Sequence, residues 1–159
     1  MKIDFLVNHP HFIETLAPPI TQHWQPIVHD ETLDTRKAKL RTHMNERDLP
    51  IAWVAYEGST VFGTASLRVN DLPGYEHLTP WLGGVFVLPQ YRGKGIGAAL
   101  CTAVEHHAAN VTGISRLYLF TLDLESWYQH MGWQTMETCT WCDQDGVIML
   151  KDLNTPSSG

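Results

Sequence analysis

The stretch 84-GVFVLPQYRGKGIGAAL-100 constrains the fold of this chain more than any other part of the sequence. Its apolar start belongs to a run, 82–88, that predicts a buried strand. After Pro89 comes a loop with glycines at alternate positions, Gly93, Gly95 and Gly97. From Gly95 to Asn110, apolar residues recur on one side, which predicts an amphipathic helix. A strand that leads through a glycine-rich turn into a helix indicates an α/β fold.

The glycine-rich turn has the features of an anion site. Glycines remove side chains where backbone N–H groups must approach a ligand closely. The first N–H groups of a helix have no partner within it, and the helix dipole is positive at that end. Arg92 and Lys94 add positive charge to a chain whose net charge is −6. The loop is therefore expected to bind a pyrophosphate.

Two familiar phosphate-binding motifs fit this loop less well. A P-loop requires Gly-x-x-x-x-Gly-Lys-Ser/Thr, but Gly93-Lys94 is followed by Gly95, and position 88 is leucine. A dinucleotide-binding fold requires Gly-x-Gly-x-x-Gly directly after a strand, whereas here residues 89–92 intervene and the spacing differs. A turn that serves only to pack the helix on the sheet stays open as an alternative.

The rest of the pattern predicts the order β-α-α-β-β-β-α-β-α-β-β, a mixed sheet with helices on both faces. We expect Pro18-Pro19 to break or kink the first helix, and Thr32 or Asp34 to cap the second. The last two strands are expected to form a hairpin about Asp145-Gly146. The expected strands are 2–7, 51–57, 60–69, 82–88, 115–122, 133–142 and 146–153, and the expected helices are 11–24, 33–45, 95–110 and 124–131.

Composition and length limit the classes of protein to consider. The 159 residues suit one domain, which we place at residues 1–153, followed by a flexible polar tail at 154–159. No apolar run reaches the length of a membrane helix, and the N-terminus lacks the features of a secretory signal, so we expect a cytoplasmic protein without a membrane partner. The acidic charge argues against a nucleic-acid partner and mildly favours a cationic one.

Cysteines and histidines offer little further chemistry. Cys139 and Cys142 form a CxxC, but no second ligand pair at zinc-site spacing accompanies it, and the motif lies in a predicted strand. The histidine pairs 9/11 and 106/107 lack the i, i+4 spacing of a helical metal site. We expect no metal, and we interpret the two cysteines as ordinary strand residues.

Two segments carry a family resemblance. The segment 92-RGKGIG-97 resembles motif A of the GNAT superfamily of N-acetyltransferases, whose pattern is Arg/Gln-x-x-Gly-x-Gly/Ala. The segment 127-WYQHMGW-133 resembles that family's aromatic-Tyr-x-x-x-Gly-aromatic segment, at about the expected distance. The resemblance covers residues 3 to 153. It implies a mixed α/β fold with a mostly antiparallel sheet of about six or seven strands, in which the strands at 82–88 and 115–121 splay apart.

The resemblance also implies a binding site for acetyl-CoA as co-substrate. The backbone of Val85, Phe86 and Val87 would pair with the pantetheine amides. The pyrophosphate would be held by the loop, with the side chains of Arg92 and Lys94 as additional contacts. The backbone amides concerned are those of Gly93, Lys94, Gly95, Ile96, Gly97 and Ala98.

The implied reaction is attack of an amine on a thioester. It passes through an oxyanion, which a backbone N–H near Phe86 or Val87 would stabilise, and it expels a thiolate. Tyr128 matches the family's general acid, and packing beside Trp127 and Trp133 is the alternative role for this residue. No acid lies on the strand with Gly83 and Gly84, where many relatives have a glutamate. The candidate bases are Asp71, Glu76, His77, Asp123 and Glu125, and a water relay is equally open.

The acceptor is expected between the 20–45 helices, the 70–81 loop and the 122–128 segment. Acidic and aromatic residues there suit a small cationic amine, and an aminoglycoside is the most specific expectation. Protein or peptide N-terminal or lysine acetylation stays open, as do a catalytically silent acyl-CoA-binding module, a dinucleotide-binding protein and homodimerisation. The residues that offer these groups are Trp24, Glu31, Asp34, Asp71, Tyr75, Glu76, Trp81, Asp123 and Glu125.

Overall fold

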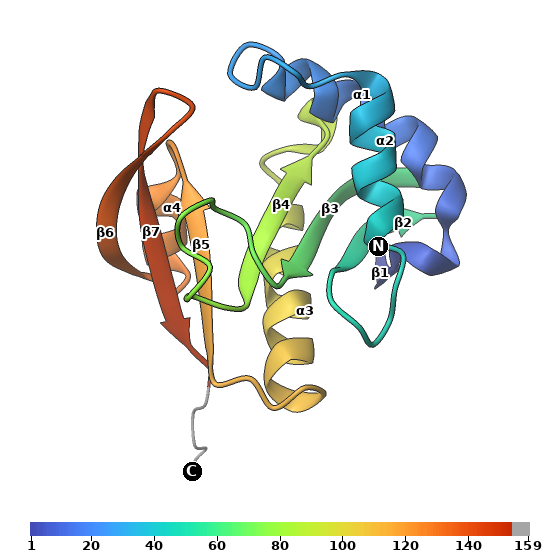
Figure 1. Cartoon of the computed structure of the whole chain (residues 1–159). Helices are drawn as coiled ribbons and strands as arrows, with labels where there is room; N and C mark the ends of the chain where they lie inside the picture. The colour runs from blue at the N-terminus through green and yellow to red at the C-terminus, as the bar shows by residue number, and fades with distance from the viewer. Residues whose placement is uncertain (154–159) are drawn as a thin grey trace.

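The computed structural model describes residues 1–153, so the expected tail at 154–159 lies outside the described residues. Within them, strands and helices follow one another in the predicted order (Figure 1). The strands are β1 (Lys2–Phe5), β2 (Ile51–Glu57), β3 (Thr60–Arg68), β4 (Trp81–Val87), β5 (Arg116–Thr121), β6 (Gln134–Trp141) and β7 (Gln144–Asp152). The helices are α1 (Ile13–Trp24), α2 (Leu33–Thr42), α3 (Ile96–Asn110) and α4 (Glu125–His130), and short 3₁₀ turns lie at Leu6–Asn8, Pro10–Phe12 and Pro89–Tyr91.

All the strands belong to one sheet, in the order β1-β2-β3-β4-β5-β7-β6. Neighbouring strands run antiparallel except β4 and β5, which run parallel. The expected mixed, mostly antiparallel sheet is therefore confirmed. Its centre is the β4–β5 boundary, where two antiparallel halves of the sheet meet.

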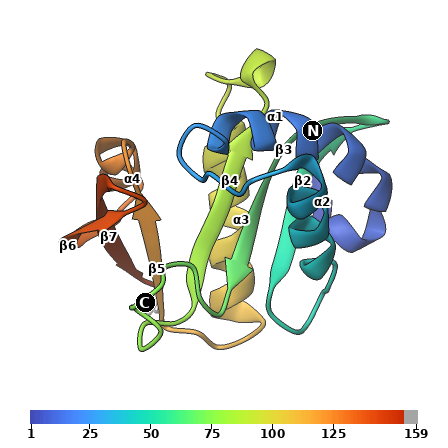
Figure 2. The same cartoon turned by 45° about the horizontal axis from the view of Figure 1, so that its top comes forward.

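β4 and β5 meet only at one end. Trp81 is paired with Tyr118, and the Tyr118 N–H donates to the carbonyl oxygen of Pro80 at 3.1 Å. Further along, β4 pairs only with β3 up to Val87, and β5 pairs only with β7 up to Thr121. Figure 2 shows the two strands diverging from their shared end. The expected splayed strand pair is present, and it leaves backbone of β4 without a neighbour on one side.

Helices cover both faces of the sheet. On one face, Leu100 and Val104 of α3 share a buried core with Leu67 of β3 and with Tyr128 of α4. On the other face, α1 packs with α2 over β2, β3 and β4, and Leu16 belongs to this second core. Burial of these apolar side chains is the main favourable contribution to folding. The two layers hold β4 and its following loop between them.

Of the two effects expected of Pro18-Pro19, a break does not occur, because α1 continues through both prolines. Proline lacks the N–H that would bond to the carbonyl four residues earlier, so the carbonyls of Glu14 and Thr15 lose their helical partners. Both of those residues are exposed. Water can therefore replace the lost hydrogen bonds, and the buried side of α1 stays intact.

The second helix begins as one of the two alternatives predicted. Thr32 is its cap: its Oγ1 accepts from the Thr35 N–H at 3.1 Å, and the Thr35 Oγ1 accepts from the Thr32 N–H at 2.9 Å. This reciprocal pair is a capping box. Asp34 lies in the first turn, where its charge suits the helix dipole.

The turn of the last hairpin is not at Asp145-Gly146, so that expectation is wrong. β6 pairs with β7 down to Trp141 and Gln144, which leaves Cys142 and Asp143 as the two turn residues. Both have positive φ, 49° and 61°, as a two-residue turn between twisted strands requires. Gly146 lies inside β7 instead, where a Cβ would come within 2.6 Å of the Phe120 ring.

Candidate active site

The glycine-rich loop joins the end of β4 to the start of α3. Gly93 and Gly95 both have φ of +80°, a left-handed conformation that favours glycine. A Cβ at either position would meet no heavy atom within 4 Å. These two glycines are therefore needed for the path of the backbone, and not to relieve crowding inside the protein.

The backbone N–H groups from Gly93 through Ala98 point to no acceptor within the described residues. Gly95 is the N-cap of α3, and no side chain caps the helix. The first N–H of this region that bonds within the protein is that of Ala99, to Gly95 O at 3.1 Å. A run of unpaired donors at the positive end of a helix fits a pyrophosphate, which agrees with the expectation from sequence.

Two cationic side chains border this loop. The Arg92 Nε donates to Val87 O at 2.8 Å, and its guanidinium lies 5.2 Å from the centre of the Phe86 ring. The Lys94 Nζ lies 6.0 Å from the centre of the Tyr91 ring. Arg92 and Lys94 are both exposed, so their charge faces solvent at the mouth of the splayed strands.

β4 contains a bulge at its two glycines. Ser66 pairs with Gly83 and Thr64 with Phe86, so Gly84 and Val85 lie opposite a single residue of β3. Gly84 has φ of +59°, which few residues other than glycine adopt easily. The bulge bends β4 at the place where it leaves β5.

Beyond the bulge, alternate residues of β4 face the gap. The Phe86 carbonyl oxygen lies 2.7 Å from the Cβ position of Gly63, and the Leu88 N–H donates to Phe62 O, so these residues turn their backbone to β3. Alternation along an antiparallel strand then turns the backbone of Val85 and Val87 to the open side. Phe86 itself directs its ring to the core beneath α1.

Tyr128 lies on α4 beside this gap and is 5% exposed. Its ring packs edge to face on Trp127 and Trp133, with centroids 4.9 and 6.1 Å away. Its hydroxyl makes no hydrogen bond to the described residues. Burial raises the pKa of Tyr128 well above its usual value, and the negative charges of Asp71 and Asp123 act in the same direction. The hydroxyl therefore keeps its proton at neutral pH.

A chain of aromatic rings crosses the gap on the α1 face. The rings meet in sequence, with centroids 4.8 to 5.9 Å apart, from Phe86 on β4 to Phe120 on β5. The contacts between them are made by His23 and Trp24 at the end of α1 and by Trp141 at the end of the β6–β7 hairpin. Aromatic groups therefore enclose the side of the gap opposite α3.

Sequence reasoning did not single out Arg68 or His43, which form a polar cluster with Asp71 over the bulge. The Arg68 Nη1 donates to Asp71 Oδ1 at 2.7 Å, and the Arg68 Nε donates to His43 Nε2 at 2.9 Å. A Cβ at Gly83 or Gly84 would collide with Asp71 or Arg68. The pair of glycines was the available signal, because it marks a place where other side chains approach β4.

The other residues expected near the acceptor are differently placed. Glu31 is bonded to Arg36, Glu76 accepts from the Gly74 N–H, and Trp81 is fully buried. Among the candidate bases, Asp71 lies against β4, and Asp123 is exposed at the end of β5. Of the other candidate bases, His77 stacks on Tyr75, and Glu125 accepts a hydrogen bond from Thr135. Two further residues of the expected acceptor site are Tyr75, which donates to Glu137, and Asp34, which is exposed on α2.

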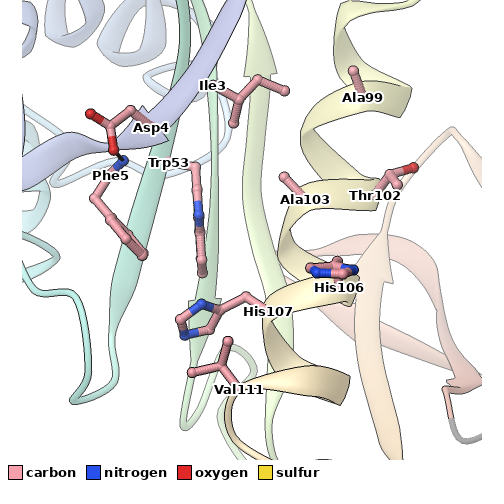
Figure 3. Close-up of a pocket in the computed structure, with 10 residues that line it drawn as sticks. All are labelled: Ile3, Asp4, Phe5, Trp53, Ala99, Thr102, Ala103, His106, His107 and Val111. Carbon is pink, nitrogen blue, oxygen red and sulfur yellow. Dashed lines mark hydrogen bonds between the residues drawn. The ribbon is translucent and has the colours of Figure 1, made fainter.

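A separate hollow of about 460 Å³ lies on the other side of α3, between that helix and the edge strand β1 (Figure 3). Phe5, Trp53 and His107 line it, and it contains none of the predicted site residues. The His107 ring packs against both of the other rings. This hollow is therefore distinct from the gap between β4 and β5.

Residues 1–153 were found to contain neither a group of metal-binding side chains nor a membrane-spanning helix. Across this range, no three side chains of His, Cys, Asp or Glu come together as a metal ion would need. None of the helices described there is both long and apolar enough to span a bilayer. Cys139 is half-buried on β6, whereas Cys142 is exposed in the turn, so the interpretation of Cys142 as a strand residue is wrong.

Comparisons with known proteins agree with this geometry. The fold is similar to that of an aminoglycoside 6'-N-acetyltransferase complexed with coenzyme A (TM-score 0.77, 18% identity, 99% of this chain and 100% of that one). It is also similar to the aminoglycoside 6'-N-acetyltransferase from Enterococcus faecium (TM-score 0.76, 18% identity, 99% and 100%) and to ribosomal-protein-alanine N-acetyltransferase from Brucella melitensis (TM-score 0.73, 20% identity, 96% and 99%). No curated protein sequence matches the chain.

At such low identity, these structures establish the fold alone. The sequence itself goes further, because residues 13–133 match the model of the acetyltransferase (GNAT) family. This match spans most of the chain and includes both the glycine-rich loop and Tyr128. The chain belongs to the acetyltransferase (GNAT) family.

Proposed function

We propose that the protein transfers the acetyl group of acetyl-CoA to a primary amine of a small molecule, in a complex that holds both substrates. The observation that carries this proposal is the run of unpaired N–H groups from Gly93 through Ala98, which follows a strand that leaves its neighbour β5 after Trp81. Acetyl-CoA would supply the acetyl group as a thioester.

The chain's own groups suit the two halves of this co-substrate. The N–H groups of the loop would hold the pyrophosphate, with Arg92 and Lys94 nearby as positive charges. Val85 and Val87 would pair with the pantetheine amides, because their backbone groups face the gap. Phe86 would contribute its ring, and not its backbone, to the acetyl-CoA site, because its carbonyl oxygen faces β3. An N–H of β4 beside the bulge would stabilise negative charge on the carbonyl oxygen.

Tyr128 is proposed as the proton donor to the departing sulfur. A thiol has a pKa near 8.5 and a phenol near 10 in water, so the transfer is not steeply uphill there. Burial holds the hydroxyl in its protonated form, which is the form a donor needs. A positioned acid of this kind typically contributes about 10²–10⁴-fold in rate.

The acceptor is proposed to be a small cationic amine. Trp24, Phe120 and Trp141 enclose the acceptor side with aromatic faces, and Asp71 and Asp123 lie near Tyr128. Faces of this kind attract a cation. An aminoglycoside is the most specific candidate, and the two aminoglycoside acetyltransferases of similar fold support it. Acetylation of a protein N-terminus is the second candidate, supported by the similarity to the ribosomal-protein-alanine enzyme.

The test is release of free thiol from acetyl-CoA in the presence of a panel of amines. The panel holds aminoglycosides, polyamines, amino acids, and peptides with acidic or basic N-termini. We expect turnover with one class of amine, and a loss of about tenfold or more in Tyr128→Phe. Tyr56→Phe is the matched control, because Tyr56 lies on β2, two strands away from β4.

Other outcomes would replace the proposal by a different one. Tight binding of coenzyme A without turnover of any amine would indicate an acyl-CoA-binding module. Binding of a nicotinamide dinucleotide in place of coenzyme A would revive the dinucleotide-binding alternative. Equal rates for wild type and Tyr128→Phe would remove Tyr128 from the chemistry while leaving the acetyltransferase in place.

A further inference from the structure

The side chains of Asp71 and Arg68 cover the two glycines of β4. At Gly83, a Cβ would lie 3.0 Å from Asp71 Oδ2, and at Gly84, a Cβ would lie 2.5 Å from Arg68 Nη2. The strand has no acidic side chain of its own at this bulge. Instead, it leaves room for a carboxylate and a guanidinium that come from the end of β3 and the loop that follows. The space beside the bulge is therefore charged, although β4 itself is not.

Both charged groups are held firmly in place. The His43 Nδ1 lies 2.8 Å from the Lys39 carbonyl oxygen, so this nitrogen carries the hydrogen and the Nε2 is free to accept from Arg68. Arg68 in turn bonds to Asp71, and the two side chains are only 11% and 17% exposed. The adjacent Leu72 is 4% exposed and anchors the loop that carries Asp71. A fixed charge in such surroundings needs no reorganisation when a substrate arrives.

One atom of each charged group has no partner. Asp71 Oδ1 accepts from Arg68 Nη1, and Arg68 Nε donates to His43. The remaining two atoms, Asp71 Oδ2 and Arg68 Nη2, make no hydrogen bond within residues 1–153. The unpartnered oxygen lies against the bulge, over Gly83 of the strand that borders the gap. The carboxylate of Asp71 is also near enough to Tyr128 to contribute, after burial, to the raised pKa of the tyrosine hydroxyl.

We infer that Asp71 receives the acceptor's ammonium group and takes its proton during acetyl transfer, and that Arg68 is the residue that positions it. This inference rests on the proposed function, because it assigns a role within the same reaction. It selects one residue from the open set of candidate bases. The selection depends on the placement of Asp71 over Gly83, which the sequence does not reveal.

Asp71 Oδ2 first takes one proton from the ammonium group, which frees the nitrogen lone pair. The lone pair forms the C–N bond with the acetyl carbon, the C–S bond breaks, and the sulfur takes the proton of the Tyr128 hydroxyl. The nitrogen becomes far more acidic as the C–N bond forms, so its second excess proton passes to water. The two residues are later restored by proton exchange with water.

The test is the dependence of kcat/KM on pH for the best amine of the panel. With Asp71 in place, the ammonium form is the one that binds and reacts, so kcat/KM should be flat between about pH 6 and the pKa of the amine. In Asp71→Asn, only the neutral amine can react, so kcat/KM should rise about tenfold per pH unit up to that pKa. At pH 7, we expect a loss of about 100-fold in the variant.

Further variants separate this role from a structural one. Asp71→Glu keeps a carboxylate, so it should keep the flat profile even at a lower rate. Asp152→Asn is the matched control: it removes the acid of another Asp–Arg pair, with Arg116, whose bond is also 2.7 Å long but which is exposed at the far end of β5. It should leave both the rate and the profile unchanged. Calorimetric binding of acetyl-CoA should be the same in all variants.

The possible failures are distinguishable. If the wild-type protein binds no acetyl-CoA or acetylates no amine, the proposed function itself fails. If wild type turns over and Asp71→Asn shows the wild-type profile at any rate, Asp71 is not the proton acceptor and the inference is overturned. If Asp71→Asn is unfolded, Asp71→Glu decides, because a sloping profile in that variant would also overturn it.

Discussion

The indole rings of Trp24 and Trp141 meet edge to face, with centroids 5.6 Å apart and planes at 83°. Trp24 ends α1, and Trp141 ends β6, so this contact joins the helical layer to the last hairpin. It closes the chain of rings that crosses from β4 to β5. The two halves of the splayed sheet are therefore connected above the proposed acceptor site, although β4 and β5 do not pair there.

We predict that Trp141→Ala weakens binding of the acceptor without affecting acetyl-CoA. Removing the indole opens the acceptor side and removes a face for the cation, which is worth about 0.5–2 kcal/mol. The KM for the amine should rise by roughly two- to thirtyfold. Steady-state kinetics and calorimetry with acetyl-CoA measure the two effects separately. An unchanged KM for the amine would place the acceptor elsewhere.

A second prediction concerns Gly95, which we compare with Gly113. Both have positive φ, +80° and +70°, and neither would bring a Cβ within 4 Å of another residue. Replacing either glycine by alanine should therefore strain the backbone to a similar degree. The unfolding free energy of each variant should fall by about 1–2 kcal/mol. Only Gly95→Ala should also weaken acetyl-CoA, because it alone disturbs the N–H groups before α3.

Urea unfolding and calorimetric titration with acetyl-CoA test this pair of variants. We expect a similar loss of stability in both and a loss of affinity of about tenfold in Gly95→Ala only. Gly113 lies in the connection from α3 to β5, away from the glycine-rich loop. If both variants bind acetyl-CoA as wild type does, the loop is not its pyrophosphate site.

The parts of the fold that could be predicted from sequence are those fixed by local patterns. The strand, glycine-rich turn and helix at 82–110 follow from apolar periodicity and from glycines that the backbone needs. The cap at Thr32 likewise depends on neighbours within one turn. Such features are set by residues a few positions apart, so a single sequence is enough to indicate them.

The incorrect predictions arose where a local signal had two readings. Asp145-Gly146 resembles a hairpin turn, but Gly146 is needed inside β7 because Phe120 lies against it. The left-handed turn lies at Cys142 and Asp143 instead. A cysteine within a strand-like segment does not indicate such a turn. In α1, two prolines were expected to break or kink the helix; the helix is not broken, and its buried side packs in the second core.

The polar cluster at the bulge was beyond the reach of sequence patterns. His43, Arg68 and Asp71 come from α2's end, β3 and a loop, and only folding brings them together. The sequence did place Asp71 among several possible bases, yet it offered no reason to prefer it. That reason is the Cβ-sized space above Gly83, which is a property of the packed structure.

A third prediction concerns the cysteines. Burial raises the pKa of Cys101 to about 12, and the charge of Glu105 adds to the effect, so its thiol does not ionise at neutral pH. Cys142 is exposed in the hairpin turn. In the native protein, iodoacetamide at pH 8 should therefore label Cys142 and leave Cys101 unmodified until the protein is denatured.

Mass spectrometry of peptides before and after denaturation measures this difference. Cys142→Ser should remove the rapid labelling and leave the slower sites unchanged. Rapid modification of Cys101 in the folded protein would mean that the α3 face near Tyr128 opens to solvent. In that case, the environment assigned to the Tyr128 hydroxyl would also be wrong.

The last prediction is that acid destabilises the protein through His43. Burial lowers the pKa of this histidine to about 4, and the positive charge of Arg68 acts in the same direction. The unfolded chain takes up a proton at its ordinary pKa near 6.5, whereas the folded protein resists it down to about pH 4. The contribution of His43 is therefore complete above pH 6.5 and is lost as the pH falls toward 4.

The expected loss is about 3 kcal/mol of unfolding free energy over this range. Urea unfolding of wild type and His43→Gln between pH 7.5 and 4.5 measures it, because glutamine can still donate to Lys39 O and accept from Arg68 without titrating. The variant should show a shallower decline than wild type. His107→Gln is the control for the other buried histidine, whose pKa burial also lowers. If wild type and His43→Gln decline in parallel, His43 is not the neutral acceptor that holds Arg68 over the bulge.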